Sequence, residues 1–228
     1  MKDILIIDCG PSLAEVTKVF GSAPEWIMSC LDEEKCNFTW IKPYDGDQIG
    51  SKYYDAWIIT GSPRSVYENE DWMLSIEEEL RLIKSSDTLV LGICFGSQLI
   101  AQAFGGKVQL NPNGWELGAY SIELTDIGKK TPLFLGFKNN EIVYESHQDC
   151  VTQLPDDAIE LAKNKKGNQS FSVYNNFYGV QFHPEFSLDI IKKYVAIRKA
   201  KGVPVDDSSI PESVNGKLIL FNFIKLIK

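Results

Sequence analysis

Cys94 stands where the sequence predicts that a buried strand turns directly into a helix. A run of β-branched and apolar residues from Thr88 leads into Gly92-Ile93-Cys94-Phe95-Gly96, and helical spacing of apolar residues begins at once from Ser97. Such a corner strains the backbone and exposes the side chain, while the flanking glycines let strand and helix approach closely. The helix N-terminus favours thiolate over thiol, so Cys94 could attack a carbonyl carbon. The alternative is a buried structural cysteine in a tight turn.

A cysteine nucleophile needs a general base, and the chain has two histidines, His147 and His183. His183 ends an apolar run, and Glu185 shares its face in an extended segment, where it could orient the ring. His147 also follows an expected strand, with Glu145 and Asp149 two residues away on either side. Spacing therefore leaves both histidines open, with the more rigid His-Pro-Glu corner favouring His183.

Strands that alternate with helices in the first half of the chain predict a mostly parallel sheet covered on both sides. The expected strands cover residues 3–8, 38–41, 56–60 and 88–93, and the expected helices cover 13–20, 71–84 and 97–104. The helix over 71–84 would turn Glu77, Glu78 and Glu79 to solvent. Ligands of such sheets bind beyond the carboxyl ends of the strands, where Cys94 and the loop at Gly61 would both lie.

The second half of the chain has short, partly alternating apolar runs with turns between them, a pattern typical of hairpins. The expected strands cover residues 107–110, 120–124, 142–145, 171–174 and 178–182, followed by a helix over 187–201, a polar linker over 202–211 and a C-terminal helix. We therefore expect a single α/β domain over residues 1–228. Its mostly parallel central sheet would be flanked by helices and would carry a small antiparallel edge sheet.

Composition excludes several classes of protein. The chain is 44% hydrophobic and 24% charged, as in globular domains, and its net charge of −8 argues against nucleic acid as a partner. No apolar run reaches the ~18 residues of a membrane span, and the N-terminal run is too short for a signal peptide, so we expect a cytoplasmic protein without a membrane partner. Five cysteines without a CxxC pair indicate neither a disulfide framework nor a zinc site.

Two motifs, LGICFGSQ and GVQFHPEF, together resemble the signature of class I glutamine amidotransferases, which carry a Cys-His-Glu triad. TGSPRSV resembles that family's oxyanion loop, and SHQDCVTQLPDDA its segment ahead of the triad histidine. The resemblance implies a flavodoxin-like amidotransferase architecture with Cys94, His183 and Glu185 as the triad. The backbone N–H groups of Gly61 and Phe95 would form the oxyanion hole.

The same resemblance implies that one group of residues holds the α-amino and carboxylate ends of glutamine: Gln98, Ser146, His147, Gln148 and Asp149. In that arrangement His147 becomes a wall of the pocket. The segment NGWELG around Trp115 resembles a free-standing subgroup that includes proteins like GMP synthase and plant γ-glutamyl peptidases. Trp115, Arg64 and Tyr67 would then set the room beside Cys94.

The implied reaction is hydrolysis of the glutamine side-chain amide through a γ-glutamyl thioester on Cys94, giving glutamate and ammonia without a metal or cofactor. We expect a free-standing domain similar to the amidotransferase domain of GMP synthase, with a separate synthetase subunit as a possible partner. The alternative enzyme is a γ-glutamyl peptidase that uses the same triad and releases an amino acid or peptide. A regulatory protein that keeps the fold is a third possibility, disfavoured because every triad position is filled.

Overall fold

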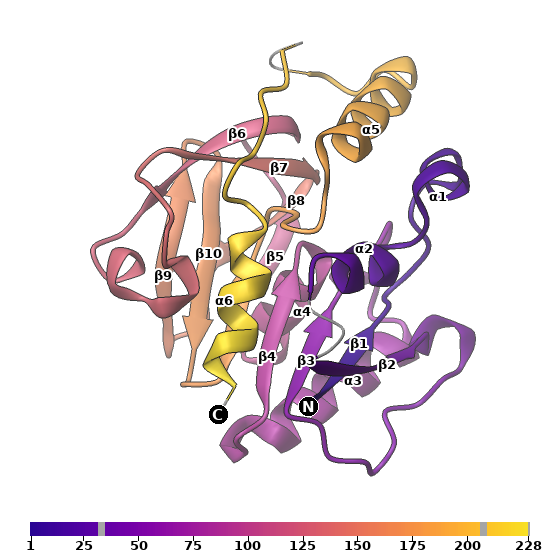
Figure 1. Ribbon diagram of the computed structural model, residues 1–228, viewed down its shortest axis with the longest axis vertical. Coiled ribbons are helices and arrows are strands. Elements are labelled where there is room, and N and C mark those ends of the chain that lie inside the picture. Colours follow the sequence, from indigo (N-terminus) through magenta and orange to yellow (C-terminus); the bar gives the residue numbers. More distant parts are fainter. Residues whose placement is uncertain (32–34, 206–208, 228) are drawn as a thin grey trace.

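The computed structural model describes residues 1–31, 35–205 and 209–227 (Figure 1). The strands are β1 (Lys2–Ile7), β2 (Cys36–Ile41), β3 (Ala56–Ile59), β4 (Leu89–Ile93), β5 (Lys107–Leu110), β6 (Glu116–Leu124), β7 (Glu141–His147), β8 (Asp149–Gln153), β9 (Ala158–Asn164), β10 (Gly167–Val173) and β11 (Phe177–Val180). The helices are α1 (Ala14–Phe20), α2 (Ala23–Ser29), α3 (Asp71–Leu82), α4 (Phe95–Ala103), α5 (Leu188–Ala200) and α6 (Leu218–Leu226).

A nine-stranded sheet in the order β2-β1-β3-β4-β11-β10-β9-β6-β7 organises the described part of the chain. The first five strands in this order pair in parallel, and the other four continue the sheet with antiparallel pairs. Strands β5 and β8 form a separate antiparallel pair. The predicted fold class is confirmed. Antiparallel strands occur in the large sheet as well as in the small two-stranded one.

Helices cover both faces of the parallel strands, because successive side chains of a strand point to opposite faces. On β1, Ile4 and Ile6 pack in the core that α2 and α6 complete. Leu5 and Ile7 pack on the other face, in the core that α3 and α4 complete. Figure 1 shows α6 crossing in front of the sheet, with α3 and α4 on its far side.

Helices α1 and α5 lie beyond the carboxyl ends of the parallel strands, at the top of Figure 1. They share a third apolar cluster with α2 and with residues of β6 and β7, which includes Trp26, Tyr144, Phe186 and Tyr194. This cluster fixes α5 over the edge of the sheet at which β1, β3, β4 and β11 all end. The loops that follow these four strands therefore meet beneath α5.

Several boundaries differ from those predicted. Helix α4 begins at Phe95, directly after the corner, and β8 and β9 were not predicted. The expectation that Glu77 faces solvent is wrong: its side chain is buried, pairs with Arg81 at 3.3 Å and accepts a 2.7 Å hydrogen bond from Gln102. The linker expected over 202–211 includes residues 206–208, which lie outside the described residues. None of the described helices is long and apolar enough to cross a membrane.

Candidate active site

Cys94 occupies the corner between β4 and α4 with φ 52° and ψ −106°, a conformation that L-residues rarely adopt. Its N–H donates to the carbonyl of Val180 at 2.8 Å, and its carbonyl accepts from the N–H groups of Ser97 and Gln98. These contacts hold a backbone conformation that costs about 1–3 kcal/mol by itself. The strained strand-to-helix corner predicted from the sequence is therefore present at Cys94.

The two glycines around Cys94 allow this corner to close. A Cβ atom on Gly92 would lie 2.4 Å from the carbonyl carbon and oxygen of Gly96, and a Cβ on Gly96 would lie 2.3 Å from the oxygen of Ile59. Real Cβ atoms do not approach backbone so closely. Glycine at these two positions therefore allows the close packing of α4 against β3 and β4.

His183 follows β11, the strand next to β4, and its ring lies beside Cys94. Its N–H donates to the carbonyl of Tyr144 at 2.8 Å, and its ring stacks on Phe186 with centroids 4.1 Å apart. Nδ1 lies 2.8 Å from Oε1 of Glu185. Because β4 and β11 are neighbouring parallel strands, the corner of one and the end of the other bring Cys94, His183 and Glu185 together.

The charges around His183 favour its protonated form. Burial alone lowers the pKa of His183, but the charges of Glu185 and Cys94 and the hydrogen bonds with them raise it well above its usual value. The side chain of Glu185 is itself buried, and its Oε2 atom has no partner among the described residues. Glu185 can thus stabilise an imidazolium that forms when His183 takes a proton from the Cys94 thiol.

The backbone of both residues predicted to form the oxyanion hole, Gly61 and Phe95, lies beside Cys94. Phe95 is the first residue of α4, so its N–H has no acceptor within the helix. A Cβ on Gly61 would lie 3.1 Å from Cε1 of His183 and 3.8 Å from Cβ of Cys94, so the Gly61 backbone passes close to both. The structure therefore brings both predicted oxyanion residues to the cysteine.

Cys94 separates two hollows in the surface. The polar pocket is lined by all six of the predicted substrate residues: Gln98, Trp115, Ser146, His147, Gln148 and Asp149. The pocket on the side of His183, called the apolar pocket, has Leu13, Trp26, Phe186 and Tyr194 in its lining, together with the loop at Gly10. Cys94, Ser62, Pro63, Ser146 and Arg198 border both pockets.

Gln98 and Asp149 direct much of their hydrogen bonding into the protein. The Gln98 amide donates to the carbonyl of Asp149 at 3.0 Å and to Oε1 of Gln181 at 3.1 Å. The Asp149 carboxylate accepts from the hydroxyls of Ser65 at 2.5 Å and Tyr67 at 3.1 Å. Both residues therefore fix the backbone that walls the polar pocket.

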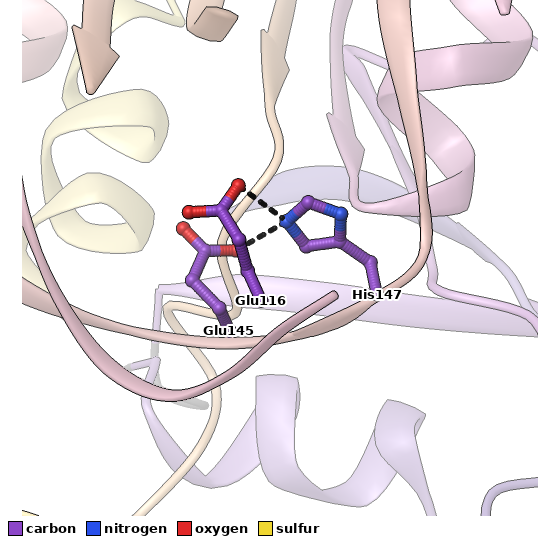
Figure 2. A group of neighbouring side chains, drawn as sticks. All are labelled: Glu116, Glu145 and His147. Atoms are coloured by element: carbon purple, nitrogen blue, oxygen red, sulfur yellow. Dashed lines mark ion pairs between the residues drawn. The ribbon is translucent and has the colours of Figure 1, made fainter. Parts of the chain in front are cut away.

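His147 belongs to a buried cluster with Glu116 and Glu145, in which Nε2 lies 3.3 Å from Oε2 of Glu116 and 3.1 Å from Oε2 of Glu145 (Figure 2). Its Nδ1 lies 2.8 Å from the carbonyl oxygen of Asp149, to which it donates. Both ring nitrogens therefore contact groups other than Cys94. The sequence left His147 open as the base, and the geometry favours His183.

Electrostatics make this cluster an ion network. Burial alone lowers the pKa of His147, but its ion pairs with Glu116 and Glu145 raise it well above the usual value. Burial raises the pKa of Glu145 to about 7. Burial also acts to raise the pKa of Glu116, but the hydrogen bond and charge of His147 bring it below the usual value. Glu116, Glu145 and His147 are also the group of described residues that could hold a metal ion, because their ligand atoms lie within 4.8 Å of one another. A protonated His147 ring between the two carboxylates supplies the positive charge that a metal ion would bring.

Sequence reasoning missed Arg198, on α5, which borders both pockets and lies over the Trp115 ring at 5.2 Å. Of the three residues expected to set the room beside Cys94, Trp115 and Arg64 line the polar pocket with Cys94, whereas Tyr67 does not. Arg64 is exposed and pairs with Glu68 at 3.1 Å and with Glu70 at 3.3 Å. An arginine on an amphipathic helix gives no signal in the sequence, because only the docking of α5 shows which side chains reach the site.

Comparisons with known proteins identify the family of the chain. The family model for glutamine amidotransferase class-I matches residues 16–200. The chain is 30% identical over 196 residues to γ-glutamyl peptidase 4 of Arabidopsis thaliana, covering 83% of this chain and 78% of that protein. It is 30% identical over 202 residues to the glutamine-hydrolysing GMP synthase of Petrotoga mobilis, covering 86% of this chain and 36% of that protein.

Solved structures share the fold. A glutamine amido transferase from Methylobacillus flagellatus superposes with a TM-score of 0.76 at 18% identity, covering 100% of this chain and 96% of that one. The family model spans most of the chain, including the corner at Cys94 and the segment at His183. The chain therefore belongs to the class I glutamine amidotransferase family.

Proposed function

We propose that this protein hydrolyses the side-chain amide of glutamine through a γ-glutamyl thioester on Cys94. The observation that carries this proposal is the alignment of Cys94, His183 and Glu185. A strained cysteine faces a histidine whose Nδ1 lies 2.8 Å from a buried carboxylate. A nucleophile, a base and a group that orients the base are the parts that nucleophilic catalysis requires.

In the first half of the reaction, the Cys94 thiolate attacks the γ-carbonyl carbon and the carbonyl oxygen becomes an oxyanion. The N–H groups of Phe95 and Gly61 would stabilise that charge, and one such donor is typically worth about 3–4 kcal/mol. The protonated His183 then gives its proton to the departing nitrogen, the C–N bond breaks and ammonia leaves.

In the second half, water replaces the leaving group. His183, now neutral, takes a proton from water as its oxygen attacks the thioester carbon, and the C–S bond breaks to release glutamate and the Cys94 thiolate. Glu185 remains ionised throughout and holds the ring. All residues in this scheme lie in the described part of the chain.

A second candidate, a γ-glutamyl peptidase, has support from the apolar pocket beside His183, because an amino acid or peptide needs room that ammonia does not. The similarity to γ-glutamyl peptidase 4 also supports it. The two candidates share the thioester and differ in the group that leaves.

Transfer of the ammonia would require an acceptor. We propose a separate synthetase subunit as the partner in that case. The similarity to GMP synthase supports this partner, since the matched region covers only 36% of the Petrotoga mobilis protein.

The experiment that tests the function measures glutamate release from L-glutamine and from γ-Glu-Gly, side by side. Cys94→Ser should abolish both activities, whereas Cys36→Ser, a control at another buried cysteine, should keep them. Turnover of glutamine alone would establish a glutaminase, and preferred cleavage of γ-Glu-Gly a peptidase. Full activity in Cys94→Ser would refute both.

A further inference from the structure

Arg198 carries a positive charge at the catalytic cysteine without a carboxylate partner in the described residues. Its guanidinium lies over the Trp115 ring at 5.2 Å, and its Nε atom is buried without a hydrogen-bond acceptor. The other arginine that borders a pocket, Arg64, already pairs with two glutamates. A buried guanidinium donor that lacks an acceptor costs free energy unless a ligand supplies one, and its planar fork matches a carboxylate.

The two pockets on either side of Cys94 bind different parts of the substrate. The leaving nitrogen takes its proton from His183, so the leaving group must extend toward that ring. His183 borders the apolar pocket and not the polar one, whereas Gln98 and Asp149 border only the polar pocket. The γ-glutamyl part therefore lies in the polar pocket and the leaving group in the apolar pocket.

The apolar pocket suits a leaving group that is larger than ammonia and carries a negative charge. Leu13, Trp26 and Phe186 supply an apolar wall. Two charged side chains that border it besides the His183 ring are Glu185, which is engaged by His183, and Arg198. A carboxylate in this pocket would therefore find its cationic partner in Arg198.

We propose that Arg198 binds a carboxylate on the leaving group, so that the preferred substrates are γ-glutamyl amino acids or peptides with a free carboxylate. This proposal rests on the second candidate of the proposed function, the γ-glutamyl peptidase, since it uses the role of His183 to place a leaving group larger than ammonia. It deepens that function by naming the residue that selects the leaving group.

The test compares γ-Glu-Gly with γ-Glu-glycinamide, which differ only in the carboxylate of the leaving group. The wild type should prefer γ-Glu-Gly, by kcat/KM, about tenfold or more, as expected of a charge-assisted hydrogen bond. Arg198→Met should bring this ratio close to one, and Arg198→Lys should keep part of it. Arg81→Met, at an arginine that borders neither pocket and pairs with Glu77, should leave the ratio unchanged.

Binding separates this proposal from the proposed function. Calorimetry with Cys94→Ser should show tighter binding of γ-Glu-Gly than of γ-Glu-glycinamide, and Cys94→Ser combined with Arg198→Met should lose the difference. If this difference is present but the wild type cleaves neither substrate, the peptidase function fails and the role of Arg198 in binding the carboxylate stands. The role of Arg198 is refuted if both proteins bind the two ligands equally, or if neither ligand binds. It is also refuted if Arg198→Met keeps the wild-type ratio, because the side chain would then act on the γ-glutamyl part or on folding.

Discussion

Nδ1 of His183 lies 2.8 Å from Oε1 of Glu185, and both side chains are buried. A single proline separates the two residues, so this contact depends on one turn of backbone and not on a distant loop. The same ring stacks on Phe186, which packs against Trp26 and Tyr194. The base of the proposed triad is therefore held both by a charge and by an aromatic stack.

We predict that Glu185→Gln lowers kcat about 100-fold or more, because an amide cannot stabilise the imidazolium of His183 as a carboxylate does. The pKa of His183 should also fall, since the charge of Glu185 helps to raise it. The pH profiles of kcat and kcat/KM measure the two effects, with the exposed Glu15→Gln as the control. An unchanged profile in Glu185→Gln would remove Glu185 from the mechanism.

We predict that Gly92→Ala destabilises the fold by about 1–3 kcal/mol or more, because the new methyl group would meet the backbone of Gly96 at 2.4 Å. Urea unfolding measures the loss, and activity should fall with it as the corner at Cys94 shifts. Gly50→Ala is the matched control, since a Cβ there meets nothing within 4 Å. Equal stability of Gly92→Ala and the wild type would contradict the close packing of α4.

The buried cluster at His147 predicts a pH dependence of stability. Burial raises the pKa of Glu145 from 4.5 to about 7, so the folded state binds this proton more tightly than the unfolded state. The resulting stabilisation is complete below about pH 4.5 and is lost as the pH rises through about 7. The hydrogen bonds and charges of Glu116 and Glu145 raise the pKa of His147 well above its usual value, so the folded state also favours the protonated ring.

Glu145→Gln removes that titration. Its Tm relative to the wild type should therefore rise between pH 5 and pH 8, because only the wild type must hold an ionised Glu145 at the higher pH. Thermal unfolding in a series of buffers measures this difference. Parallel curves for the two proteins would show that Glu145 does not titrate in this window.

The sequence predicted the parts of the site that depend on local geometry. The corner at Cys94 follows from a strand, two glycines and a helix that are adjacent in the chain, and the contact of His183 with Glu185 follows from an i, i+2 spacing. The choice between His183 and His147 was not local. It depends on the pairing of β4 with β11 and on the position of Glu116, which pairs with His147 across two strands.

Tertiary packing explains what the sequence did not predict. Glu77 stands in an acidic run typical of an exposed face, yet the approach of α4 buries it against Gln102. Strand β9 has the sequence AIELAKN, in which apolar and polar residues do not strictly alternate, so it gives a weak strand signal. Arg198 borders both pockets beside Cys94 because α1, α2 and the His183 segment fix α5 over the site.

The most direct test of the central claim is to map the site that a glutamine analogue with a chloroketone in place of the side-chain amide modifies. Peptide mass spectrometry of the inactivated protein should find the label on Cys94 and on none of the other four cysteines. His183→Asn should slow the labelling, since the base no longer generates the thiolate. Complete inactivation with Cys94 unmodified would contradict the account, because the nucleophile would then be another residue.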